Sequence, residues 1–133
     1  MKQALLRVEG LRKKFGERVL FDRAALELHA GHGYVLSGAN GSGKTTLLRI
    51  LAGLEDAQDG RLIFRGVAAA PSAVPEPWRR DIVYVHQQPY LFHTSTEKNL
   101  EYGLVQRGVA LGERRARVSE ALQWAGLADK RDV

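Results

Sequence analysis

The sequence predicts an α/β fold, a sheet combined with a helix that begins at a glycine-rich loop. Three observations predict it. Short apolar runs typical of buried strands occupy residues 33–37 and 81–85. A glycine-rich stretch, residues 38–43, directly follows the first run, and residues 44–54 after it have helical spacing with Gly53 near the end. The 133 residues, 44% of them hydrophobic, are enough for one core and too few for two.

An antiparallel β part precedes the glycine-rich loop. Residues 5–8 and 19–28 alternate partly between apolar and polar side chains, and residues 13–18 between them form a polar turn that contains a glycine. We therefore expect a hairpin-like pair of strands.

The segment beyond the helix returns to the sheet. A turn at Asp59 and Gly60 leads into a strand at residues 61–65, and an irregular connection rich in alanine, proline and serine follows over residues 66–77. The apolar run at residues 81–85 is the last strand that the pattern predicts.

The C-terminal part has a helical pattern. Residues 96–107 and 112–126 show helical spacing, with Ser95 or Thr96 as the cap of the first helix. We expect the second helix to pack internally through a set of apolar side chains: Val118, Leu122 and residues 124–127.

Charge and composition exclude several classes of function. The net charge of +5 comes from 20 basic and 15 acidic residues, but the basic residues are dispersed and form no stripe, so we expect no specific nucleic-acid partner. The absence of cysteine excludes a thiolate metal site, and no apolar run approaches the roughly 18 residues of a membrane span. No secretory signal opens the sequence, which favours the cytoplasm.

The glycine-rich loop carries the chemistry. Residues 38–45 fit the pattern Gly-x-x-x-x-Gly-Lys-Ser/Thr without a mismatch, between a predicted strand and a predicted helix. Glycines allow successive amides to face a phosphate, and the helix N-terminus adds its positive dipole end. Lys44 places a charge toward the β- and γ-phosphates, and the Thr45 hydroxyl is placed to coordinate Mg²⁺. The predicted nucleotide-binding residues here are Gly38, Asn40, Gly41, Ser42, Gly43, Lys44, Thr45 and Thr46.

The motif and its surroundings resemble the ATP-binding subunits of ABC transporters, a family of P-loop ATPases, over essentially the whole chain. Residues 8–16 are similar to the family's opening strand, which ends in an aromatic residue that stacks on adenine. The resemblance assigns that role to Phe15.

Residues 82–92 resemble the family's Q-loop, in which a strand ends in a glutamine that reaches the magnesium ion and the attacking water. The resemblance assigns this role to Gln87, with Gln88 as the alternative register, and makes Gln87 and Lys44 the catalytic residues. His86 stands where an aromatic residue is commoner in the family. The sequence of residues 86–89, His-Gln-Gln-Pro, is also similar to that of importers of inorganic oxyanions such as tungstate.

Residues 91–104 resemble the start of the family's helical subdomain, which contacts the membrane permease. The resemblance divides the chain into a nucleotide-binding core with the β part, residues 1–89, and the start of the helical subdomain, residues 90–133. It also implies ATP and Mg²⁺ as ligands, a second ATP-binding subunit as a partner, and a cytoplasmic location at the inner face of the cell membrane.

The family's later motifs do not occur in these 133 residues. The Leu-Ser-Gly-Gly-Gln signature, the Asp-Glu pair that ends a strand and the switch histidine are all lacking, so we expect a truncated domain that binds ATP and hydrolyses it weakly or not at all. Two other functions stay open: a soluble ABC ATPase acting on nucleic acid or ribosomes, and a P-loop small-molecule kinase. The short spacing between Thr45 and Gln87 disfavours the first, and the strands before the loop disfavour the second.

Overall fold

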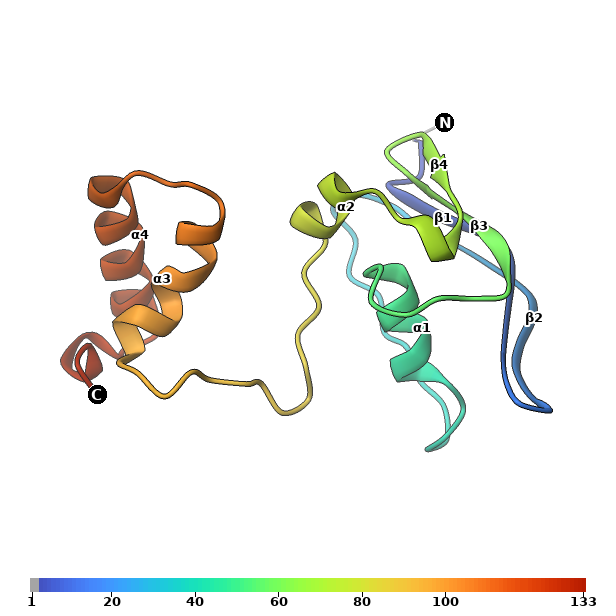
Figure 1. Cartoon of the computed structure of the whole chain (residues 1–133), viewed down its shortest axis with the longest axis horizontal. Coiled ribbons are helices and arrows are strands. Elements are labelled where there is room, and N and C mark those ends of the chain that lie inside the picture. Colours follow the sequence, from blue (N-terminus) through green and yellow to red (C-terminus); the bar gives the residue numbers. More distant parts are fainter. Residues whose placement is uncertain (1–2) are drawn as a thin grey trace. The chain divides into compact units, whose positions relative to one another are not determined.

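The computed structural model describes residues 3–133, which fall into two compact units, one ending at Val85 and the other beginning at His86. Figure 1 shows the β-strands in the first unit and the two longest helices in the second.

The first unit contains an antiparallel four-stranded sheet in the order β2-β1-β3-β4 (Figure 1). Its strands are β1 (Leu6–Phe15), β2 (Arg18–Leu28), β3 (Asp59–Phe64) and β4 (Val67–Ala69). The predicted pair of N-terminal strands is confirmed by β1 and β2. The predicted turn at residues 13–18 is too long, because β1 continues to Phe15 and only Gly16 and Glu17 form the turn.

The predicted turn at Asp59 and Gly60 is wrong, because both residues lie inside β3. A Cβ at Gly60 would stand 2.8 Å from the Cα of Leu11, and its φ is 119°. The glycine therefore serves a close approach of β3 to β1, at an irregularity in their register.

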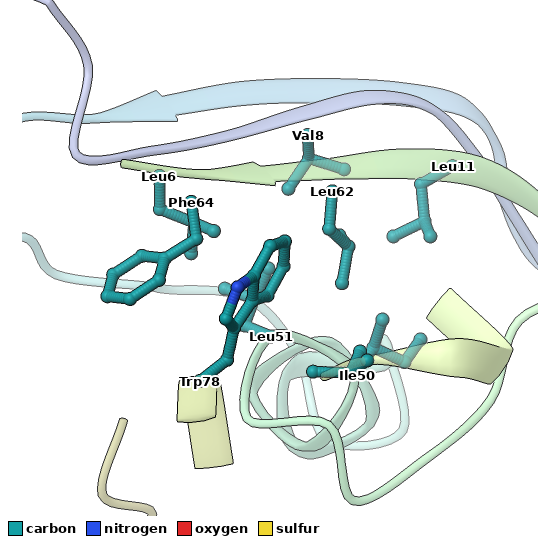
Figure 2. Close-up of a cluster of buried hydrophobic side chains, with 9 residues drawn as sticks. Leu6, Val8, Leu11, Ile50, Leu51, Leu62, Phe64 and Trp78 are labelled. Carbon is teal, nitrogen blue, oxygen red and sulfur yellow. The ribbon is translucent and has the colours of Figure 1, made fainter. Parts of the chain in front are cut away.

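The core lies between one face of this sheet and the helices of the first unit, as Figure 2 shows. Helix α1 (Lys44–Leu51) contributes Ile50 and Leu51, and the short helix α2 (Glu76–Asp81) contributes Trp78, whose ring centroid lies 5.6 Å from that of Phe64. The buried hydrophobic cluster consists of Leu6, Val8, Leu11, Ile50, Leu51, Leu62, Phe64, Val74 and Trp78.

The connection over residues 66–77 is more ordered than the sequence predicts. It contains β4, the 3₁₀ turn η1 (Pro71–Ala73) and the first residues of α2. Proline near the start of η1 and of α2 favours both, because its fixed φ suits the first turn of a helix.

The two buried strands predicted at residues 33–37 and 81–85 are not formed. Neither run belongs to a strand within the described part of the chain, and Asp81 closes α2 instead. Val35 is 95% exposed, and Val83 and Val85 are 74% and 78% exposed. Apolar composition alone does not make a strand, because a strand also needs a neighbour that satisfies its backbone groups.

The second unit is helical, as predicted. It contains α3 (Thr96–Gln106), α4 (Leu111–Trp124) and the 3₁₀ turn η2 (Ala128–Lys130). Ser95 caps α3 by accepting a hydrogen bond from the Lys98 amide, which confirms the first of the two predicted caps.

Packing of α4 confirms only part of the prediction. Val118 and Leu122 are 2% exposed, but Trp124 is 90% and Leu127 is 41% exposed, so the internal packing predicted for residues 124–127 is wrong. Trp124 is the last residue of the helix, and the spacing from Leu122 turns it away from the buried side.

Candidate functional site

The glycine-rich loop ends at the N-terminus of α1. Gly43 is the N-cap residue and has a left-handed backbone with φ 98°, which a glycine adopts without strain. A Cβ at Gly43 would stand 2.9 Å from the Phe21 ring. The loop therefore requires glycine at this position for both its backbone angle and its packing.

Two residues of strand β2 contact the loop. Phe21 lies against Gly43, and the Arg18 guanidinium donates a hydrogen bond of 2.6 Å to the Gly41 carbonyl. Neither residue was predicted to belong to the site, because nothing in the local spacing links β2 to a loop more than 20 residues away. Only the fold brings them together.

The N-terminus of α1 has free hydrogen-bonding capacity. No side chain caps this helix and its first turn has no acidic residue, as judged over residues 3–133. The amide of Leu47 is bonded to the Gly43 carbonyl, whereas the amides of Lys44, Thr45 and Thr46 precede the first intrahelical bond. These amides and the helix dipole fit an anion, which is the chemistry of a nucleotide phosphate.

Lys44 folds back onto the loop. Its Nζ donates hydrogen bonds to the carbonyls of Gly38 and Ala39, at 2.7 and 2.9 Å. An ammonium group in this position adds positive charge to the loop. Thr45, the next residue, is exposed at the start of α1.

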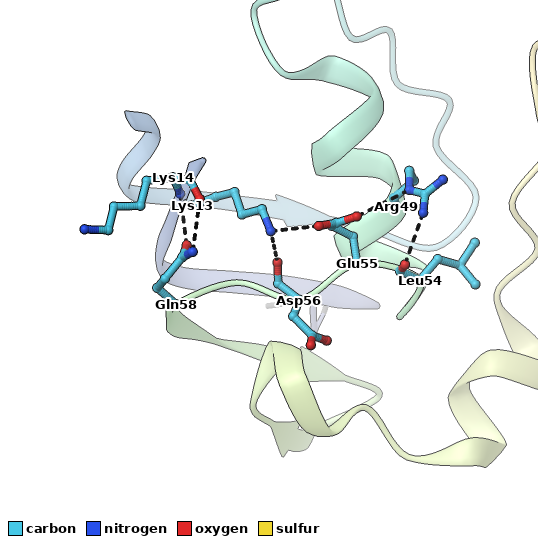
Figure 3. A network of polar contacts seen from close by, with 7 residues as sticks. All are labelled: Lys13, Lys14, Arg49, Leu54, Glu55, Asp56 and Gln58. Carbon is cyan, nitrogen blue, oxygen red and sulfur yellow. Dashed lines mark hydrogen bonds and ion pairs between the residues drawn. The ribbon is translucent and has the colours of Figure 1, made fainter. Parts of the chain in front are cut away.

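Phe15 ends β1 and is half-exposed. The Lys13 Nζ lies 4.5 Å from the centroid of its ring. Lys13 itself is 5% exposed, and its ammonium donates hydrogen bonds to a Glu55 carboxylate oxygen at 2.8 Å and to the Asp56 carbonyl at 2.6 Å (Figure 3). The aromatic side chain thus stands beside a buried charge whose partners lie just beyond α1.

The carboxylate in this network is held ionised. The hydrogen bond from Lys13 lowers the pKa of Glu55 below its ordinary value of 4.5, and the charges of Lys13 and Arg49 act in the same direction against the opposing effect of burial. The Arg49 Nε lies 3.7 Å from the second carboxylate oxygen. The side chain of Gln58 makes two hydrogen bonds with the backbone of Lys14, accepting one from its amide and donating one to its carbonyl (Figure 3).

The part of the chain that contains this loop matches a known protein family. The sequence profile of the ABC transporter family matches residues 21–133, which include the loop and every element from α1 onward. The chain belongs to the ABC transporter family. Members of this family bind ATP, and the uncapped start of α1 fits that ligand.

Relatives in the ABC transporter family are longer than this chain. It is 38% identical to the Fe(3+) ions import ATP-binding protein FbpC of Pasteurella multocida, over 94% of this chain and 35% of that protein. It is 37% identical to the spermidine/putrescine import ATP-binding protein PotA of Pseudomonas aeruginosa, over 98% of this chain and 35% of that protein. The chain thus spans about a third of the length of these curated relatives.

Solved structures confirm the predicted fold class. An ATP-binding cassette of an ABC transporter, MJ1267, superposes with a TM-score of 0.80 at 26% identity, covering 98% of this chain and 57% of that one. CbiO1 of Clostridium perfringens, part of the ABC transporter complex cbiONQ, superposes with a TM-score of 0.79 at 26% identity, covering 97% and 53%. The chain therefore has the fold of an ABC ATPase domain over about half of that domain's length.

Gln87 lies in the second unit, at an exposed bend. Its predicted contact with magnesium and the attacking water stays a prediction, as does the adenine contact of Phe15. In the part of the chain that is described, no helix has the length and apolar character that crossing a membrane requires.

Proposed function

We propose that the chain is part of the ATP-binding subunit of an ABC transporter and that it binds the triphosphate of ATP at residues 38–46. The observation that carries this proposal is the start of α1, where unbonded amides, a left-handed glycine and the Lys44 ammonium converge without a capping side chain within the described residues. Family membership supplies the identity of the nucleotide.

Each loop residue has a role in this proposal. Lys44 leaves the carbonyls of Gly38 and Ala39 and pairs with the β- and γ-phosphates, because a charged phosphate oxygen is a stronger acceptor than a neutral carbonyl. The remaining loop residues surround the triphosphate chiefly with backbone amides: Gly38, Asn40, Gly41, Ser42, Gly43 and Thr46. Phe15 stacks on the adenine base.

Thr45 and Gln87 are the residues that would hold a magnesium ion. The exposed Thr45 hydroxyl is the protein ligand that α1 offers, and Gln87 provides a second ligand and orients the attacking water. A bound Mg²⁺ would supply positive charge to the phosphates, and Lys44 and the loop amides would hold the phosphates in place. Hydrolysis of ATP, as a property of the whole protein, would then be coupled to transport.

The proposed partners follow from the relatives. FbpC and PotA are named as import ATP-binding proteins and CbiO1 as part of a transporter complex, which supports a membrane permease as partner. A second ATP-binding subunit and a position at the inner face of the cell membrane complete the proposal. The division into a nucleotide-binding part, residues 1–89, and the start of a helical subdomain, residues 90–133, belongs to it too.

Calorimetric titration of the chain with Mg-ATP tests the proposal. Replacing Lys44 with alanine should weaken binding by about tenfold to a hundredfold, the value of a hydrogen bond to a charged group. Lys98→Ala, which removes the same charge from an exposed position on α3, serves as the control and should leave the affinity unchanged. Equal affinity in Lys44→Ala and the control would refute the assignment of the loop.

A further inference from the structure

Lys13 stands where the strand pattern calls for an apolar residue. Buried side chains in β1 include Val8 and Leu11, and Lys13 continues the series two residues beyond Leu11. A lysine is almost never fully buried without a partner, because its charge must be compensated. The contacts that compensate this charge therefore indicate what the residue does.

The ammonium of Lys13 has three neighbours, and one of them is Phe15. Glu55 and the Asp56 carbonyl accept its hydrogen bonds and fix the position of its nitrogen. The Phe15 ring presents a face to the same nitrogen, at 4.5 Å from the ring centroid. A cation held over an aromatic face attracts the ring electrostatically and so restrains its orientation.

Phe15 has little other support. The ring is half-exposed, it is not among the side chains that form or line the hydrophobic core, and no aromatic partner of it occurs among residues 3–133. Its orientation therefore depends on the contact with Lys13 more than on packing.

We propose that Lys13 is a positioning residue for nucleotide binding: it holds the Phe15 ring by one face and keeps the ring oriented for stacking with a purine base. This inference rests on the proposed function, in which Phe15 meets the base. The cation also draws electron density from the ring, which favours stacking of an electron-rich base.

The same network reaches the helix that carries the phosphate loop. Glu55 joins Lys13 to Arg49 of α1, with the Arg49 Nε 3.7 Å from the carboxylate (Figure 3). A purely structural role for Lys13 would be to hold β1 against the segment that follows α1 through its hydrogen bonds to Glu55 and Asp56. Its loss would then disturb the loop and weaken every ligand that binds through phosphates. A positioning role would weaken only ligands that have a base.

The experiment compares Mg-ATP with Mg-tripolyphosphate, which has the same phosphate chain and no base. Calorimetry gives both dissociation constants for the chain and for Lys13→Met, which keeps the aliphatic stem and removes the charge. We expect the affinity for ATP to fall about threefold to fivefold and the affinity for tripolyphosphate to stay constant. Lys13→Arg, which restores a cation, should recover most of the difference. An unchanged ratio of the two affinities in folded Lys13→Met overturns the proposal.

Two further variants make the outcome decisive. Phe15→Ala should lower the ATP affinity toward that of tripolyphosphate, and adding Lys13→Met to it should change nothing more, because the ring through which Lys13 acts is gone. Additive losses in the double variant contradict the proposal. If Lys13→Met does not fold by circular dichroism, Lys13→Gln, which can still donate to the Asp56 carbonyl, takes its place under the same criteria.

The failure of this inference is distinguishable from the failure of the proposed function. Should the unaltered chain bind neither ligand, the phosphate loop is misassigned. Should Phe15→Ala leave the ratio of affinities unchanged, Phe15 does not meet the base, and the role of Lys13 falls with it. Should Phe15→Ala lower the ratio while Lys13→Met does not, only the role of Lys13 is refuted.

Discussion

The first unit contains two kinds of apolar segment that look alike in sequence and differ in structure. Strand β3 buries Leu62 completely in the core that α1 shares, whereas residues 33–37 and 82–85, which are richer in apolar side chains, leave Val35 and Val83 largely exposed. The strand has hydrogen-bonded neighbours on both sides, β1 and β4. The difference teaches that pairing, more than hydrophobicity, decides which segment becomes part of a core.

Truncation of a core leucine should have the largest effect. Leu62→Ala removes a side chain that is 0% exposed and should lower the free energy of unfolding by about 2–5 kcal/mol. Val35→Ala, at 95% exposure, should change it by less than about 0.5 kcal/mol. Urea denaturation followed by circular dichroism measures both, and comparable losses would show that residues 33–37 are packed in solution.

The glycine-rich loop packs against a strand of the first unit, since Gly43 lies against Phe21 of β2. Gly43→Ala forces a side chain into the left-handed region and onto Phe21, so we expect a loss of about 1–3 kcal/mol in stability and weaker binding of Mg-ATP. Gly103→Ala, inside α3 where an added Cβ meets nothing within 4 Å, should instead stabilise by about 0.5–1 kcal/mol. Thermal denaturation distinguishes the two, and a stabilised Gly43→Ala would contradict the support from β2.

The second unit contains a set of polar contacts around Asn99 in addition to its buried side chains Val118 and Leu122. The side-chain oxygen of Asn99 accepts a hydrogen bond from the backbone amide of Phe92. Its side-chain nitrogen donates to the backbone carbonyls of Phe92, Thr94 and Ser95. Asn99→Asp removes the donors at constant size and should cost about 1–2 kcal/mol. Gln123→Glu, at an exposed position of α4, introduces the same charge and should change stability by at most about 0.5 kcal/mol. Equal losses of stability would mean that Asn99→Asp acts through the added charge alone and not through the lost hydrogen bonds.

The smallest effect concerns the ion network beside β1. Because Lys13 lowers the pKa of Glu55, the carboxylate stabilises the fold at neutral pH, and that contribution is lost as the pH falls below the ordinary value of 4.5 and through the lower folded-state pKa. Glu55→Gln should remove less than about 1 kcal/mol at pH 7 and flatten the acid limb of the stability curve. Denaturation between pH 7 and pH 3 measures this, and parallel acid limbs in the two proteins would contradict the ion pair.

Local patterns in the sequence predicted some parts of this molecule and missed others for physical reasons. The first two strands, α1, the cap of α3 and the glycine-rich loop were predicted because each depends on residues close in the chain. The strands at residues 33–37 and 81–85 were predicted wrongly because pairing is a long-range property. Arg18 and Lys13 escaped notice because their importance lies in contacts more than 20 residues away.

Amide resonances of the phosphate loop test the central claim most directly. In a nitrogen-15 correlation spectrum of the folded chain, saturating Mg-ATP should shift the amide signals of Gly41, Gly43, Lys44 and Thr45, since these are the groups that we propose bind the phosphates. Signals from β4, on the far edge of the sheet from β2, should stay in place. Loop signals that do not move in a spectrum of well-folded protein would contradict the account.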